Sequence, residues 1–137
     1  MSENTSAPQG SPGEILNWPM LKVVYRTDPE AIAAILPPGI EPGADPHVNL
    51  TFYLVPVPDE PEYGILQTVN ADYNGLAGEY ALGYGIDQES AIFISRDHNG
   101  QPKYPCTTDY YRLGPSVTAR SHHQGYTFAE FRGTASG

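Results

Sequence analysis

Basic side chains are few in this chain, and they do not form a cluster. Seven lysine and arginine residues stand against sixteen acids in 137 residues, which gives a formal net charge of −9. A chain without a cationic stripe lacks the electrostatic footprint of a nucleic-acid-binding protein, so we expect no nucleic-acid partner. Because an acidic surface repels anions, an anionic substrate would need a local cationic pocket.

Cysteine and long apolar segments are also nearly absent. Cys106 is the single cysteine, which excludes a disulfide within the chain and fits a reducing compartment. No apolar run approaches the roughly 20 residues that a membrane-spanning helix needs, and the first residues do not have the pattern of a secretion signal. We therefore expect a cytoplasmic protein that makes no membrane contact.

Glycine, proline and tyrosine, in contrast, are abundant. Fourteen glycines and fourteen prolines predict short elements joined by many turns, with more strand than helix, and ten tyrosines argue against a disordered chain. Residues 1–14 are small and polar, and we expect them to form a disordered lead-in. Residues 15–137 are long enough to form a single domain with its own core.

One helix is predicted near the N-terminus. The segment Thr27-Asp28-Pro29-Glu30 has the pattern of a capping box, with the Thr27 hydroxyl as the cap and Glu30 three residues later. Pro29 falls in the first turn, where its missing N–H has no cost. The following Pro37-Pro38-Gly39 should end the helix abruptly.

The remaining pattern is typical of strands. Apolar alternation between turn residues predicts strands at 20–25, 47–57, 63–73, 78–86 and 90–97, with one or two more in 116–133. The predicted fold class is mainly β with one short N-terminal helix, an α+β arrangement that forms a barrel or a curled sheet. An open edge on the final strand favours either oligomerisation or a longer parent protein.

The sequence motifs do not indicate a metal site or a nucleotide-binding site. His122 and His123 are adjacent, and adjacent residues of a strand point to opposite faces, so they cannot easily share one metal ion. The chain has no phosphate-binding loop and no nucleophile elbow. Cys106 can be interpreted as a nucleophile near His98 or as a small buried residue, and the second interpretation is the simpler one.

Lysine is the remaining class of nucleophile. A neutral amine can attack a ketone and form a Schiff base, whose iminium allows loss of CO₂ or of a proton, or cleavage of a carbon–carbon bond. Prolines flank Lys103, and three tyrosines close in sequence could shield it from water: Tyr104, Tyr110 and Tyr111. The alternative is an ordinary exposed loop lysine, which would keep its proton at neutral pH.

An ordered series of motifs leads to this lysine. Between Tyr73 and Lys103 the chain carries Asn74-Gly75, Gly78-Glu79-Tyr80, Glu89-Ser90-Ala91-Ile92, Ser95-Arg96-Asp97 and Pro102-Lys103. In its order and spacing this segment resembles the acetoacetate decarboxylase family. Residues 23–42 resemble the entry strand and first helix of the same family, so that the resemblance covers residues 20–133.

The resemblance implies a fold and an activity. It implies that Lys103 is the Schiff-base lysine of a lyase that acts on a small keto acid, either a decarboxylase or a related aldolase or dehydratase. It also implies a closed β-rich barrel around an apolar cavity, no metal or organic cofactor, and assembly into a homo-oligomer. Because family members are considerably longer, we expect an incomplete barrel in which residues 15–137 are the N-terminal half of the usual domain.

Two departures from the family pattern affect the expected chemistry. A second lysine that usually follows the reactive one is replaced by Tyr104, which removes one proposed cause of a depressed amine pKa. Straight alignment places Gly64 at the position of the family's catalytic glutamate. Glu62 lies two residues away, on the same face of a strand, and is thus the candidate acid for proton handling.

Four residues are candidates for binding the substrate. Arg26 or Arg96 could hold the carboxylate of a keto acid, although each could equally form a structural ion pair. Gln101 and Tyr104 flank the Pro-Lys pair and are expected to contact the substrate. The alternative function is a non-catalytic β-barrel fragment that binds a small apolar or keto ligand.

Overall fold

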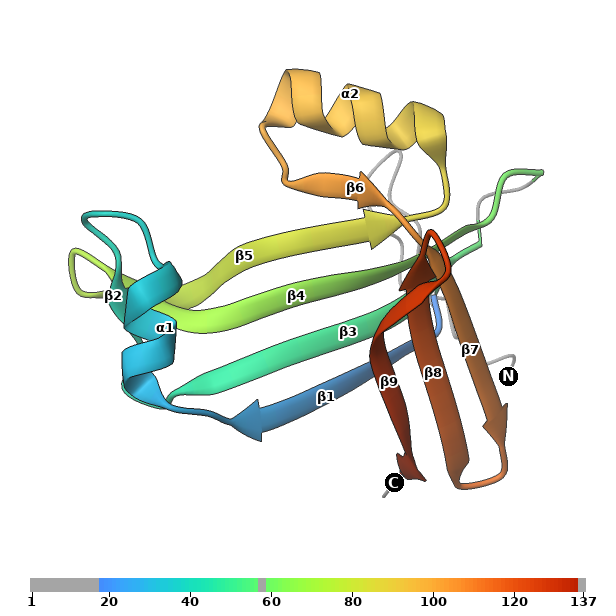
Figure 1. Cartoon of the computed structure of the whole chain (residues 1–137), viewed down its shortest axis with the longest axis horizontal. Coiled ribbons are helices and arrows are strands. Elements are labelled where there is room, and N and C mark those ends of the chain that lie inside the picture. The colour runs from blue at the N-terminus through green and yellow to red at the C-terminus, as the bar shows by residue number, and fades with distance from the viewer. Residues whose placement is uncertain (1–17, 57–58, 136–137) are drawn as a thin grey trace, which may run out of the picture.

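The computed structural model describes residues 18–56 and 59–135, which form two β-sheets and two helices (Figure 1). The predicted lead-in at residues 1–14 lies outside the described residues. The elements in chain order are β1 (Met20–Arg26), α1 (Pro29–Ile35), β2 (Glu41–Pro42), β3 (His47–Val55), β4 (Glu62–Tyr73), β5 (Leu76–Ile86), α2 (Glu89–Asn99), β6 (Lys103–Pro105), β7 (Thr107–Leu113), β8 (Ser116–His123) and β9 (Tyr126–Thr134).

The larger sheet has the strand order β1-β3-β4-β5-β6, and β2 also pairs with β4. Its neighbouring strands are antiparallel except for β5 and β6, which are parallel because α2 carries the chain back between them. The smaller sheet is the antiparallel meander β7-β8-β9. Figure 1 shows this meander crossing one end of the larger sheet at a steep angle.

Two tight turns fix the register of the long hairpins. Asn74 and Gly75 connect β4 to β5 with positive φ angles of 50° and 79°, the conformation of a type I′ turn. The Asp72 carboxylate accepts a hydrogen bond of 2.8 Å from the Gly75 N–H, which stabilises this turn. Gln124 and Gly125 connect β8 to β9 with similar angles of 50° and 80°.

The larger sheet is covered on both faces, so adjacent residues of its central strands are both buried. On the face toward the smaller sheet, one core cluster contains Phe52, Ile65, Cys106 and Ala119. On the opposite face, helix α2 packs against a second cluster that contains Tyr53, Ile86 and Ile92. Residues 52 and 53 therefore belong to different clusters, as the alternation of a strand requires.

The segment predicted as a strand at 90–97 is a helix, and that prediction is wrong. A strand that buries Ile92 would also bury Ile94, but Ile94 is 58% exposed. The structure instead buries Ile92 and Ser95, which are three residues apart on one helical face. Gly100 ends the helix in the left-handed conformation, with φ of 62°, and its N–H bonds back to the carbonyls of the last turn.

The N-terminal helix is confirmed, but its cap is one residue later than predicted. Asp28, not Thr27, is the capping residue, and its carboxylate accepts a hydrogen bond of 2.9 Å from the Glu30 N–H. Asp and Thr are both good capping residues, so the sequence pattern alone did not separate them. Pro29 lies in the first turn, as predicted, and is the first helical residue.

The fold class is confirmed as mainly β and α+β, whereas the closed barrel implied by the resemblance is not formed by the described residues. The outer edges of β1 and β6 have no partner strand in the larger sheet, and β7 and β9 are the edges of the smaller one. The two sheets therefore remain separate and open. Among the described residues, no helix is long and apolar enough to cross a membrane.

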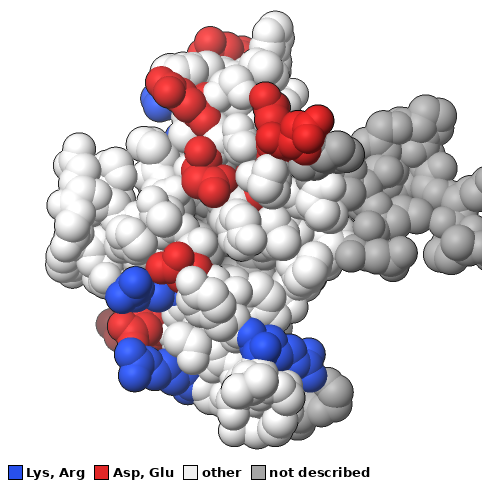
Figure 2. All heavy atoms as spheres, turned by 90° about the vertical axis from the view of Figure 1, so that its right-hand side faces the viewer, with Lys and Arg blue, Asp and Glu red and all other residues white. Residues whose placement is uncertain are grey.

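Charges of opposite sign are partly separated on the surface. In Figure 2 the acidic side chains gather mostly in the upper half of the visible face and the basic ones mostly in the lower half. Two arginines of the smaller sheet pair with neighbouring acids: Arg120 with Asp109 at 3.2 Å, and Arg132 with Glu130 at 2.8 Å. These pairs reduce the positive potential of the smaller sheet.

Candidate functional site

Lys103 is the first residue of strand β6. The flanking prolines had suggested a loop at this position, but the structure has a strand there. Lys103 is the parallel partner of Tyr84 on β5, and the backbone N–H of Tyr84 bonds to the Pro102 carbonyl at 3.0 Å. The Lys103 Nζ atom lies over the Tyr84 ring, 4.8 Å from its centroid. The lysine is half-buried, so the strand and the ring hold its amine in a defined place.

Glu62 lies on the same face of the sheet as Lys103. The Tyr53 hydroxyl donates a hydrogen bond of 2.9 Å to the Glu62 carboxylate. The Tyr53 ring packs edge-on against the Tyr84 ring, with 5.7 Å between their centroids. Two aromatic rings thus connect the Glu62 carboxylate to the Lys103 amine.

Burial favours the neutral form of both phenols. Burial raises the pKa of Tyr53 well above its usual range, and the neighbouring Tyr84 and Glu62 add to the effect. Burial also raises the pKa of Tyr84. Each phenol therefore keeps its proton at neutral pH, and the Tyr53 hydroxyl can act as hydrogen-bond donor to the carboxylate.

A glycine makes room for the Tyr53 phenol. A Cβ atom at Gly64 would overlap the Tyr53 ring and hydroxyl, and it would lie 2.7 Å from the Gly85 carbonyl oxygen. Gly64 is the position that straight alignment assigns to the family's catalytic glutamate. In this chain the Tyr53 phenol lies over that position, with the Glu62 carboxylate as its partner.

Tyr104 points away from Lys103, because successive residues of a strand face opposite sides of the sheet. Its hydroxyl donates a hydrogen bond of 2.6 Å to Gln67, and its ring packs edge-on against Phe128, 5.9 Å between centroids. The prediction that Tyr104 shields the lysine is therefore wrong, and Tyr84 has that role. A cation at position 104 would also point away from the amine.

The half-buried Tyr104 is expected to make the protein less stable at alkaline pH. Burial raises the pKa of the Tyr104 phenol from its ordinary value of 10.0 to about 12. The unfolded chain therefore releases this proton first, and the free energy of unfolding falls as the pH rises from 10 toward 12. We expect Tyr104→Phe to show a shallower fall in urea unfolding over this range. Equal slopes for the two proteins would contradict the assignment.

The remaining predicted substrate-binding residues are dispersed. Arg26 lies at the end of β1, on the opposite edge of the sheet from β6, and pairs with Asp45 at 3.5 Å. Gln101 is exposed in the connection from α2 to β6. Arg96 lies on α2 and lines a groove of about 560 Å³ that does not have Lys103 among its lining residues.

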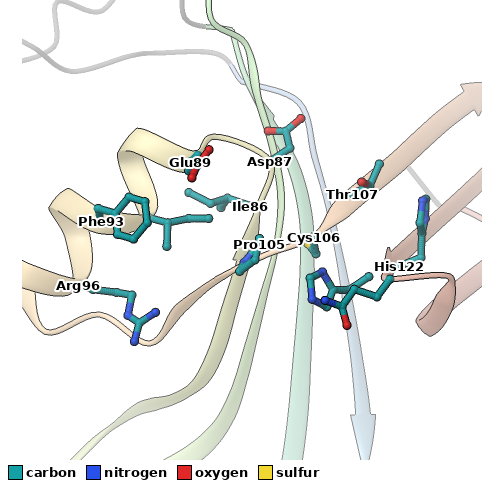
Figure 3. Close-up of a pocket in the computed structure, with 12 residues that line it drawn as sticks. Ile86, Asp87, Glu89, Phe93, Arg96, Pro105, Cys106, Thr107 and His122 are labelled. Carbon is teal, nitrogen blue, oxygen red and sulfur yellow. The ribbon is translucent and has the colours of Figure 1, made fainter.

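This groove lies between α2, the ends of β5 and β6, and the turn between β8 and β9 (Figure 3). His122 and His123 both line it, although a regular strand would point them to opposite sides. The β8–β9 register shifts between Ser121 and His122, and this bulge changes the direction of the side chains. The sequence predicted one or two strands in 116–133 but not this bulge.

Cys106 is a small buried residue, as the simpler interpretation expected. It belongs to the core cluster around Phe52 and is 5% exposed. Burial raises the pKa of its thiol, which disfavours the reactive thiolate. Within residues 18–56 and 59–135, no three His, Cys, Asp or Glu side chains converge in a way that could hold a metal ion.

These features define a mainly β domain that presents a lysine amine and a phenol-bound carboxylate on one sheet face. The sequence profile described as "Acetoacetate decarboxylase (ADC)" matches residues 2–137. The chain belongs to the acetoacetate decarboxylase family, and the resemblance seen in its motifs is confirmed.

Similar curated proteins carry the same name. An acetoacetate decarboxylase of Clostridium botulinum is 32% identical over 100 residues, which cover 70% of this chain and 39% of that protein. An acetoacetate decarboxylase of Paraburkholderia phytofirmans is 33% identical over 100 residues, 70% of this chain and 38% of that protein. The chain therefore spans less than half the length of the relatives that it matches.

Solved structures show the same fold. Acetoacetate decarboxylase from Legionella pneumophila superposes with a TM-score of 0.74 at 21% identity, over 85% of this chain and 47% of that one. The enduracididine biosynthesis enzyme MppR, in complex with pyruvate, superposes with a TM-score of 0.68 at 19% identity, over 81% and 52% of the two chains.

Proposed function

We propose that this chain carries the catalytic lysine of a Schiff-base lyase that acts on a small keto acid. The observation that supports the proposal is the placement of the Lys103 amine and the Glu62 carboxylate on one sheet face, linked by Tyr84 and Tyr53. Membership of the acetoacetate decarboxylase family supports the class of reaction. The fold neighbour MppR, which is described in complex with pyruvate, supports a keto acid as the ligand.

The proposed reaction begins with attack of the neutral Lys103 amine on the ketone carbon, followed by loss of water to give an iminium. In a β-keto acid the bond to the carboxylate then breaks. Its electron pair moves into the enamine, and CO₂ leaves. Water, or Glu62 once it has taken up a proton, protonates the enamine carbon, and hydrolysis of the iminium regenerates the amine. The face of the Tyr84 ring stabilises the positive charge of the iminium.

Reductive trapping tests this proposal. The protein is incubated with acetoacetate or pyruvate and reduced with borohydride, and the intact protein is weighed by mass spectrometry. We expect one adduct that maps to Lys103 and disappears in Lys103→Ala. With acetoacetate, the mass of the adduct shows whether CO₂ leaves before reduction, because the trapped group is then derived from acetone.

The other lysine of the chain provides the matched control. Lys22 is more exposed than Lys103 and forms an ion pair with Glu79 at 3.4 Å, so Lys22→Ala should leave the adduct unchanged. An adduct that survives in Lys103→Ala would refute the assignment.

A second candidate function is a non-catalytic binding fragment. The chain spans 39% of the Clostridium botulinum relative, and the outer edge of β6, beside Lys103, has no strand partner among the described residues. A stable complex with a keto acid that gives no trapped adduct would favour this function over the lyase.

A further inference from the structure

One side of helix α2 lines the groove with a stripe of charged and apolar side chains. Glu89, Ile92, Phe93 and Arg96 follow the i, i+3, i+4, i+7 spacing that places residues on one side of a helix, and all four line the groove. The stripe has an acid at one end, two apolar residues in the middle and a base at the other end. We propose that this groove binds a small linear zwitterion, an ω-amino carboxylate with an apolar chain.

The opposite walls of the groove complement this stripe. Asp87 lies near Glu89, so that two carboxylates mark one end, whereas Arg96 lies at the other end (Figure 3). Ile86 and Pro105 line the groove between them. The volume of about 560 Å³ is typical of a small-molecule site. A cationic head toward the two acids and an anionic tail toward the arginine would satisfy both ends.

The charged groups of the stripe are available to a ligand. Among the described residues, Arg96 has no carboxylate within 4.0 Å, whereas Arg26, Arg120 and Arg132 each have one. Glu89 likewise forms no ion pair or side-chain hydrogen bond within the described part of the chain. A paired arginine would have to break its ion pair before it could bind a carboxylate, and Arg96 does not.

Apolar and polar groups of the groove also lack partners. Phe93 is 55% exposed, which leaves a large apolar surface in contact with water. Among the residues that the structure describes, none offers a hydrogen-bond partner to the buried Nδ1 atom of His122. An alkyl chain over Phe93 would remove this apolar surface from water.

The spacing of the stripe limits the length of the ligand. Arg96 lies seven positions after Glu89, which corresponds to about 10 Å along a helix axis. The ligand must therefore separate its two charges by several methylene groups. A dicarboxylate is disfavoured, because its second carboxylate would face Glu89 and Asp87. The site is independent of the proposed lyase function, because Lys103 does not line the groove.

Calorimetric titration with a matched set of probes tests the proposal. We expect ε-aminohexanoate to bind the protein, and hexanoate and hexylamine, which each lack one charge, to bind roughly tenfold more weakly. A series from aminobutyrate to aminooctanoate should show an optimum length. Equal affinity for hexanoate and aminohexanoate, or no binding by any member of the series, would overturn the proposal.

Substitutions at the two ends of the groove test the recognition of each ligand charge independently. Arg96→Gln should weaken aminohexanoate and hexanoate but not hexylamine, and Glu89→Gln should weaken aminohexanoate and hexylamine but not hexanoate. Arg112→Gln is the control, because Arg112 lies on the smaller sheet and bonds to the Gly114 carbonyl. Lys103→Ala should bind aminohexanoate like the unmodified protein, even if the lyase proposal fails.

Self-association of the protein is the competing explanation for the exposed groove. If the protein self-associates with increasing concentration, buries Phe93 and blocks every probe, the groove belongs to a second copy of the chain and the ligand proposal is overturned.

Discussion

Replacing Gly64 with alanine is expected to lower the free energy of unfolding by about 2–3 kcal/mol, as overpacking of a tight site does. The added Cβ would overlap the Tyr53 ring, which is 1% exposed and held between other buried side chains. It would also press on the Gly85 carbonyl of the neighbouring strand, and backbone in the middle of a sheet cannot move away cheaply. Urea unfolding of the two proteins measures the difference.

A second glycine provides the matched control for this prediction. Gly78 lies on the adjacent strand β5, its φ angle is not in the left-handed region, and a Cβ there would meet no atom within 4 Å. Gly78→Ala should leave stability unchanged or raise it slightly, because alanine restricts the unfolded chain. If both variants lose stability equally, crowding around the Tyr53 phenol is not the cause.

Replacing Phe52 with alanine is expected to lower the free energy of unfolding by about 3–5 kcal/mol, the usual cost of truncating a buried aromatic residue. Phe52 is fully buried in the cluster that joins the larger sheet to the smaller one, where it packs with Ile65, Cys106 and Ala119. The lost side chain would leave a cavity between two sheets that cannot collapse fully. The midpoint of urea unfolding should fall accordingly.

The control for this truncation is an exposed apolar residue of similar character. Leu113 at the end of β7 is 86% exposed, so Leu113→Ala should change stability by less than about 0.5 kcal/mol. A loss for Phe52→Ala as small as that of Leu113→Ala would mean that the two sheets do not depend on this cluster.

The strands with clear apolar alternation could be predicted from the sequence. The strands predicted at 63–73 and 78–86 correspond to β4 and β5, and the region 116–133 contains β8 and most of β9. Helix α2 was missed because Ala91, Ile92, Phe93 and Ile94 form a continuous apolar run. Strand and helix periods cannot be told apart within such a run. The three-residue strand β6 is shorter than any periodic pattern can reveal.

The two charged residues of the candidate site were predicted, but their connection was not. Lys103 and Glu62 were selected from motif order and strand alternation, and the structure places them on one sheet face. Tyr53 and Tyr84 link them through contacts that join four strands, β3 to β6. Such contacts depend on register across the sheet, which a single sequence does not specify.

The groove had only one visible indication in the sequence, the spacing of Glu89, Ile92, Phe93 and Arg96. These four residues share one side only if the segment is a helix, and the sequence predicted a strand there. Its other wall comes from the β8–β9 turn, more than twenty residues later, so its existence depends on how the two sheets are packed.

The direction of the Lys103 side chain depends on the number of residues that connect α2 to the short strand β6. Lys103 points toward the α2 side of the sheet, whereas Tyr104 and Cys106 contribute to the core between the two sheets. One residue more or fewer between Gly100 and Lys103 would exchange these directions. The amine would then enter an apolar interior, where an unpaired charge is costly, and a phenol would take its place beside Tyr84. The length of the α2–β6 connection is therefore as much a determinant of nucleophile placement as the identity of residue 103.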